Sequence, residues 1–157
     1  MKIIKSPIIK NVIFILCGLF LFSIDRLLKI LSQHNFFQDK IIGIENIIKL
    51  DYFKNENIAF SLPTGNLVAL IISIIILILF IIYFIVKNKN NNSFFILNFS
   101  LLLVFVGTIS NIIDRIKFGY VIDYVNVLNI NVFNLSDVFI IIGFIIFSIK
   151  EIKWSQK

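Results

Sequence analysis

The 157-residue chain has few of the residues on which common enzyme sites depend. Its one cysteine, Cys17, lies in an apolar run and has no partner for an internal disulfide. A serine triad would need the one histidine, His34, which is better explained as an interfacial residue because no Gly-x-Ser-x-Gly turn accompanies it. The sequence also lacks a His and Cys cluster for zinc, a His-Glu-x-x-His motif and a glycine-rich loop before a lysine. Carboxylates therefore remain as the candidate catalytic groups.

Charged residues are scarce, at 15% of the chain, whereas hydrophobic residues make up 59% and the mean hydropathy is +0.97. An ordinary soluble domain is about 45–50% apolar, so this composition indicates an integral membrane protein. The net charge of +6 does not indicate nucleic-acid binding, because the lysines lie in short clusters beside apolar runs and form no basic face with aromatic residues.

Four apolar runs are long enough to cross the hydrocarbon core of a bilayer, which is roughly 30 Å thick and takes about 20 helical residues. They cover residues of about 11–30, 66–86, 94–113 and 133–149. The sequence therefore predicts an all-α membrane protein, with four transmembrane helices in a single integral membrane domain over residues 1–157. A cleaved signal peptide is the alternative for the first run, but no small-x-small cleavage site follows it.

Lysine clusters predict the orientation of these runs. They precede the first run, join the second to the third and follow the fourth, at Lys2, Lys5, Lys10, Lys87, Lys89, Lys150, Lys153 and Lys157. By the positive-inside rule these groups are cytoplasmic, so both termini are expected to face the cytoplasm. Residues of about 31–65 and 114–132 are then expected to face outward.

The two outward segments have strand-forming character. Residues 41–60 contain short β-favouring stretches, with Lys49 to Tyr52 alternating polar and apolar side chains as in a half-buried strand. Residues 115–132 mix glycine and asparagine with β-branched residues, which favours a loop or strand over a helix. We therefore expect a small outward-facing β-sheet.

Six acidic or amide side chains lie in or beside the apolar runs, nearly all toward the outward side, namely Asp25, Asn111, Asp114, Asp123, Asn134 and Asp137. At about 1.5 Å per residue from the cytoplasmic lysines, Asp25 and Asp137 fall several ångströms below the outer surface, and Asp114 falls near or above it. An isolated ionised carboxylate at such depth costs about 2–3 kcal/mol or more. Each buried carboxylate therefore needs a partner or a water-filled cavity.

Suitable partners occur at helical spacing. Lys29 lies four residues after Asp25, and Asn111 lies three residues before Asp114 and four before Arg115. Salt bridges near a membrane interface would explain this spacing as well as a functional site would.

Asp123 and Asp137 form a different arrangement, since an outward loop carries the first and the next helix begins with the second. Asn134, three residues before Asp137, is suited to cap that helix. Two carboxylates in one low-dielectric site do not both ionise easily, so one keeps a proton while the other activates water. Such a pair hydrolyses amides without a metal or a cofactor, as in aspartic proteases.

Five short motifs contain these residues, in order, over most of the chain. They are Asp25-Arg-Leu-Leu-Lys29, Asn55-Glu-Asn-Ile-Ala-Phe60, Gly107-Thr-Ile-Ser-Asn111-Ile-Ile-Asp114-Arg115, Gly119-Tyr-Val-Ile-Asp123-Tyr124 and Phe133-Asn-Leu-Ser-Asp137. Block by block they resemble the lipoprotein signal peptidase family, also called signal peptidase II. Its corresponding motifs are Asp-x-x-Thr-Lys, Asn-x-Gly-x-Ala-Phe, Gly-Ala-x-Gly-Asn-x-x-Asp-Arg, Gly-x-Val-Val-Asp-Phe and Phe-Asn-x-Ala-Asp.

The resemblance implies an aspartic endopeptidase that removes the signal peptide from diacylglyceryl-modified prolipoproteins by cleaving before the lipidated cysteine. It places the catalytic pair on Asp123 and Asp137. It places supporting polar residues at Asp25, Lys29, Asn55, Asn111, Asp114, Arg115 and Asn134. It also implies no metal or other cofactor, lipid-modified prolipoproteins and membrane lipid as partners, a monomer, and a bacterial inner-membrane location with the active site at the periplasmic face.

This chain departs from the family's motifs at several positions. Leu28 replaces a threonine, while Ser110 and Ser136 replace a glycine and an alanine and are small enough for close helix packing. Asp123 and Asp137 are 14 positions apart, a short connection that is still long enough to turn the chain back over a few ångströms.

Two other classes of protein fit the apolar composition. One is a small ion-coupled transporter or channel subunit, in which buried aspartates relay protons. Internal repeats and polar groups at the bilayer midplane would indicate it, whereas here the polar groups lie near one surface and no repeat is present. The other is a noncatalytic membrane assembly factor whose outward sheet binds a partner.

Overall fold

Four long helices and one small antiparallel sheet form the structure, a computed structural model that describes residues 7–37, 40–41, 47–57, 65–88, 94–128 and 130–155. The helices are α1 (Pro7–Gln33), α2 (Asn66–Asn88), α3 (Phe94–Phe118) and α4 (Leu135–Ser155). The strands are β1 (Lys40–Ile41), β2 (Ile48–Asn55), β3 (Val121–Val127) and β4 (Asn131–Phe133). The predicted combination of a helical bundle with a small sheet is confirmed.

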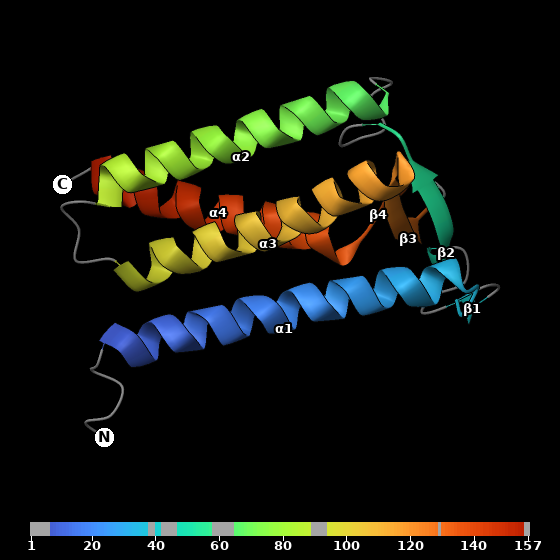
Figure 1. The fold of residues 1–157 in the computed structure, drawn as a ribbon, viewed down its shortest axis with the longest axis horizontal. Helices are drawn as coiled ribbons and strands as arrows, with labels where there is room; N and C mark the ends of the chain where they lie inside the picture. The colour runs from blue at the N-terminus through green and yellow to red at the C-terminus, as the bar shows by residue number, and fades with distance from the viewer. Residues whose placement is uncertain are drawn as a thin grey trace.

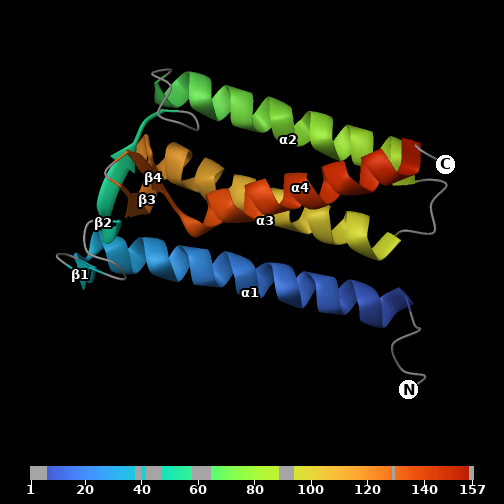
Figure 2. The same cartoon turned by 180° about the vertical axis from the view of Figure 1, so that it is seen from behind.

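The helices run side by side, and the sheet lies at one end of the bundle (Figure 1 and Figure 2). Helix α3 contacts α1, α2 and α4. The start of α1, the end of α2, the start of α3 and the end of α4 all lie at the end remote from the sheet (Figure 1). The helices therefore alternate in direction, and the end of α1, the end of α3 and the start of α4 meet beside the sheet.

Within the part of the chain that the structure describes, three helical stretches are long and apolar enough to cross a membrane, namely Asn11–Gln33, Asn66–Val86 and Ile96–Phe118. Helix α4 has 21 residues but carries Asp137 in its first turn and Lys150 and Glu151 toward its end, so a fourth crossing stays a prediction. Large apolar side chains cover the outer face of α2, where Leu79 is 60% exposed and Ile85 is 65% exposed. A face of this kind is suited to lipid and not to water.

The structure extends α3 beyond its predicted end. The helix continues to Phe118, although the sequence predicts an outward loop from residue 114. It continues because Asp114 and Arg115 are buried and bonded inside the protein, so they do not mark the end of the buried helix as a hydropathy pattern implies. Helices α1 and α4 likewise run past their predicted apolar runs, to Gln33 and Ser155.

The sheet has the strand order β1-β2-β3-β4, and each neighbouring pair is antiparallel. In the central pair, Lys54 is opposite Ile122 and Asn55 is opposite Val121, and a bulge lies between Leu50 and Phe53. The predicted strand at residues 49–52 is part of β2, whereas residues 42–46 and 58–60 of the expected strand-forming segment lie outside the described residues.

Strands β3 and β4 form the hairpin that connects Asp123 to Asp137. The turn places Leu128 in the left-handed region, with φ of 56°, and the Ile130 N–H donates to the Val127 carbonyl at 3.0 Å. This hairpin occupies the residues that were predicted as loop or strand. It reverses the chain within the short connection, so α4 starts beside β3.

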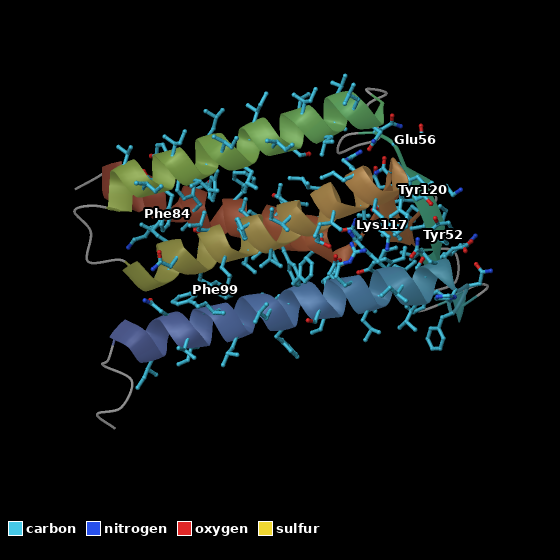
Figure 3. The ribbon with its side chains drawn as sticks, in the orientation of Figure 1. Tyr52, Glu56, Phe84, Phe99, Lys117 and Tyr120 are labelled. Carbon is cyan, nitrogen blue, oxygen red and sulfur yellow. The ribbon has the colours of Figure 1, made fainter. Side chains whose placement is uncertain are left out.

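Helices α3 and α4 approach each other closely, because glycines lie at two points of their interface. A Cβ atom on Gly107 would lie 2.4 Å from the Ser136 carbonyl oxygen, and one on Gly143 would lie 2.9 Å from the Ser100 carbonyl oxygen. The bundle is polar near the sheet, where Asn111 bonds Asp137, and apolar farther along, where Phe80 packs against Phe144. In Figure 3, Phe84 lies toward the remote end, whereas Tyr52 and Tyr120 lie at the sheet.

Candidate active site

The first turn of α4 is built around Asn134 and Asp137. The Asn134 side-chain oxygen accepts from the Asp137 N–H at 3.0 Å, and the Asp137 carboxylate accepts from the Asn134 N–H at 3.2 Å. This reciprocal pair is a capping box with aspartate at its third position, so the predicted cap is confirmed. The N–H of Leu135 donates to the hydroxyl of Tyr124 at 2.9 Å, which ties the helix start to β3. Helix α4 therefore begins at residue 135 and not at residue 133.

Asp123 projects from β3 and is fully buried. Its two carboxylate oxygens accept from the side-chain amides of Asn134, at 2.7 Å, and Asn55, at 2.9 Å. Burial of the carboxyl and the nearby charge of Asp137 raise the pKa of Asp123 from its ordinary value of 3.8 to about 7. The two amide hydrogen bonds oppose that shift because they favour the ionised form.

Asn134 touches both candidate catalytic carboxylates, since its side chain donates to Asp123 and its backbone N–H donates to Asp137. Asn111 on α3 holds the other oxygen of Asp137, to which its side-chain amide donates at 2.8 Å. The two asparagines are also joined directly, because the amide of Asn134 donates to the side-chain oxygen of Asn111 at 3.2 Å. The structure thus brings Asp123 and Asp137 to opposite sides of one asparagine.

Lys29 on α1 joins this pair to the other buried acids. Its ammonium group donates to Asn111 at 2.8 Å and to Asp114 at 2.7 Å, and it lies 3.4 Å from Asp25. Lys29, Asp25 and Asp114 are all fully buried. A buried ammonium ion needs such partners, and Lys29 has two hydrogen bonds and one further ion pair.

Asp25 connects α1 to both α3 and α4. One of its oxygens accepts from the Ser110 hydroxyl at 2.5 Å, and the other accepts from the Ser136 backbone N–H at 3.0 Å. Ser136 is the residue before Asp137. The carboxylate of Asp25 therefore holds the first turn of α4 in place beside the candidate catalytic pair.

Arg26 belongs to the same cluster and was not predicted from the sequence. Its guanidinium forms an ion pair with Asp114 at 2.5 Å and lies 3.4 Å from the hydroxyl of Ser110. Its position one residue after Asp25 and three before Lys29 was the available signal, because Arg26 and Lys29 share a helix face. The sequence likewise predicts Ser110 only as a small residue for helix packing.

Arg115 lies on the other side of the site. Its guanidinium donates to the backbone carbonyl of Asn57 at 2.7 Å and lies 3.4 Å from the side-chain oxygen of Asn66. Asn66 donates in return to the carbonyl of Arg115 at 3.3 Å, which joins α2 to α3. The Nε atom of Arg115 is buried and has no hydrogen-bond partner among the described residues. Arg115 thus holds Asn57, which follows β2, and Asn66 at the start of α2.

The charges of the cluster nearly balance. Among the described residues, four carboxylates meet three cations there, at Asp25, Asp114, Asp123, Asp137, Arg26, Lys29 and Arg115. With every group ionised the cluster would carry one negative charge, so a single proton on the carboxylates neutralises it. A low-dielectric site favours that neutral state. Within the described part of the chain, no three His, Cys, Asp or Glu side chains are placed to share a metal ion.

All nine site residues predicted from the sequence thus fall into one connected region. The fold and this region define a helical membrane protein with a buried carboxylate site. A family model described as signal peptidase (SPase) II matches residues 17–153. The chain therefore belongs to the signal peptidase II family, which is a family of aspartic peptidases that process lipoproteins.

Individual relatives agree with this membership. A lipoprotein signal peptidase of Bartonella tribocorum is 32% identical over 154 residues, which covers 94% of this chain and 92% of that protein. A lipoprotein signal peptidase of Caldicellulosiruptor bescii is 36% identical over 133 residues, which covers 84% of this chain and 85% of that protein. The structure of a bacterial membrane enzyme, solved at 2.3 Å resolution, matches this structure with a TM-score of 0.74 and 27% sequence identity. The match covers 89% of this chain and 87% of that enzyme's chain.

Proposed function

We propose that the chain is a membrane-embedded endopeptidase that cleaves diacylglyceryl-modified prolipoproteins immediately before the lipidated cysteine, with Asp123 and Asp137 as its catalytic pair. Removal of signal peptides from prolipoproteins follows from the family. The observation that supports this catalytic pair is the shared contact with Asn134, which links both carboxylates in one buried site. Asp25, Lys29, Asn55, Asn111, Asp114, Arg115 and Asn134 are supporting residues in this proposal.

The environments of the two carboxylates suggest their roles. Asp123 is fully buried and its pKa of about 7 lets it hold a proton at neutral pH. Asp137 lies in the first turn of α4, where the helix N-terminus favours a negative charge. In the proposed mechanism Asp137 is the base and Asp123 is the acid.

The reaction then needs no other titrating group. Asp137 takes a proton from a water molecule as the water oxygen attacks the scissile carbonyl carbon, and Asp123 gives its proton to the carbonyl oxygen. The tetrahedral intermediate collapses when Asp123 takes back that proton and Asp137 protonates the leaving amine of the cysteine. The C–N bond breaks, and the pair returns to its singly protonated state.

The location of the site suits a lipid-anchored substrate. It lies at the sheet end of the helices, and we propose that this end faces the periplasm, with both termini cytoplasmic and α4 as a fourth crossing of the inner membrane (Figure 1). A diacylglyceryl chain would hold the scissile bond at the same level, and the exposed apolar helix faces would admit its acyl chains from the bilayer. The protein would act as a single membrane domain and as a monomer.

The proposal is tested with Asp123→Asn and Asp137→Asn in the purified, detergent-solubilised protein, using a diacylglyceryl-modified prolipoprotein as substrate. Each change keeps the size of the side chain but removes acid and base function, so cleavage should fall by about 10³-fold or more. Asp51→Asn is the matched control, since Asp51 is an exposed carboxylate on β2. It should cleave as fast as the unchanged protein.

Two outcomes would point to other functions. Normal cleavage by both variants would rule out Asp123 and Asp137 as the catalytic pair, whereas absence of cleavage by the unchanged protein would favour an assembly factor. If the unchanged protein does not cleave this substrate and instead conducts protons in vesicles, the transporter alternative holds. Cleavage should also continue in the presence of a metal chelator.

A further inference from the structure

We infer that Ser110 is a positioning residue for Asp137, acting through Asp25, in this chain. Its hydroxyl is fully buried on α3 and donates to an oxygen of Asp25 at 2.5 Å. The other oxygen of Asp25 accepts from the N–H of Ser136, the residue that precedes Asp137. This inference deepens the proposed function and rests on it.

The Ser110 hydroxyl is needed because the remaining partners of Asp25 are few. Without it, the same carboxylate oxygen would keep only the Lys29 ammonium, at 3.4 Å. An unsatisfied buried carboxylate oxygen is costly, so Asp25 would be expected to turn toward Lys29 and draw that ammonium nearer.

Both movements would reach Asp137. Rotation of Asp25 weakens its bond to the Ser136 N–H, which helps to fix the first turn of α4. Movement of Lys29 weakens its bond to Asn111, whose amide holds an oxygen of Asp137. A displacement of well under an ångström at a general base is enough to slow catalysis.

The test compares Ser110→Ala with Ser100→Ala in the full-length protein. Ser100 is also fully buried on α3, but its hydroxyl donates to the Leu97 carbonyl of the same helix, away from the site. Both variants remove one buried hydroxyl. We expect Ser110→Ala to lower kcat about tenfold with KM within twofold, and Ser100→Ala to leave both constants within about twofold.

Equal kcat losses in the two variants, or an unchanged kcat in Ser110→Ala, would overturn the inference, as would a loss confined to KM. If Ser110→Ala does not fold, Ser110→Cys replaces it, because a thiol has nearly the same shape and is a weak donor. The same fall in kcat is then expected, and an unchanged kcat overturns the inference. Absence of cleavage by the unchanged protein would instead count against the proposed function.

Discussion

The two ends of the helical bundle are built on different principles. At the end remote from the sheet, the ring of Phe80 from α2 packs edge-on against Phe144 and Phe147 of α4, each with ring centroids 5.0 Å apart. At the sheet end, Asn111 of α3 donates to Asp137 of α4. The first end holds by dispersion between apolar groups, and the second holds by hydrogen bonds with assigned donors and acceptors.

Because of this difference in bonding, the two ends should respond differently to substitution. Dispersion is nearly independent of direction, so another apolar side chain of similar volume serves almost as well. A buried hydrogen-bonded cluster has no such freedom, because removing one partner leaves another group buried without compensation. We therefore expect the same chemical change to have very different effects at the two ends.

The largest effect is expected from Lys29→Met at the sheet end. The change leaves Asp25 and Asp114 in a buried cluster with one cation fewer, and breaking a buried ion pair costs about 3–5 kcal/mol. Thermal unfolding in detergent should show this loss of stability, and a cleavage assay should show loss of activity. Lys54→Met is the control, since Lys54 is exposed and should change neither quantity measurably. A Lys29 variant as stable as the unchanged protein would contradict the comparison.

Gly107→Ala should come next. The added Cβ would lie 2.4 Å from the Ser136 carbonyl, a backbone atom that cannot move aside, so α3 and α4 must separate just where Asn111 meets Asp137. We expect a loss of about 1–3 kcal/mol in unfolding free energy and about 100-fold in kcat. Gly18→Ala is the control, because the one close contact of its Cβ would be with the flexible tip of Leu102, and Val106 would lie at an ordinary 3.7 Å. Its kcat should stay near normal.

Asn55→Ala should change the pH profile. Its amide donates to Asp123 and favours the ionised carboxylate, so removing it should raise the pKa of Asp123 above about 7. Activity that requires protonated Asp123 should then persist to higher pH, with the alkaline limb of kcat displaced upward by about one unit. Lys54→Ala, on the same strand, should leave the limb in place. A downward displacement would contradict the assigned acid.

Asp123 also gives the unchanged protein a pH-dependent stability. Its folded-state pKa is raised from 3.8 to about 7, so its stabilising contribution is complete below about pH 4 and is lost as pH rises through 7. Asp123→Asn should remove this dependence, which unfolding measurements between pH 4 and pH 8 would show.

The smallest effect is expected from Phe80→Leu at the remote end. Phe80 is buried among rings, and its replacement by another apolar side chain should cost about 1 kcal/mol of stability. Its kcat per folded molecule should be unchanged, because no hydrogen bond of the site depends on it. A loss of activity comparable to that of Gly107→Ala would show that the two ends are coupled.

The site was easier to predict than the limits of the helices that carry it. Asp25 with Lys29, and Asn134 with Asp137, follow from helical spacing, since residues three or four apart share a helix face. The end of α3 was misplaced, because hydropathy does not register a helical turn whose polar residues are buried and paired. Asp114 is such a residue, fully buried and bonded to Lys29.

Contacts between different helices and strands could not be predicted from the spacing of residues along the sequence. The contact of Arg26 with Asp114 joins residues 88 positions apart, and that of Ser110 with Asp25 joins residues 85 positions apart. No local pattern distinguishes Ser110 from another small residue at a helix interface. Its role depends on the rotation of α3 relative to α1, which only the packed bundle fixes.

The sequence by itself determined the membrane class, three of the apolar helices, and the pairings of Asp25 with Lys29 and of Asn134 with Asp137, because these follow from composition and helical period. The tertiary structure decided how the buried charges are shared. Whether Asp25 is satisfied by Ser110, and Asp123 by Asn55 and Asn134, depends on the relative placement of helices and sheet. Hydrogen bonds are short and directional, so they are specified only when those elements come together.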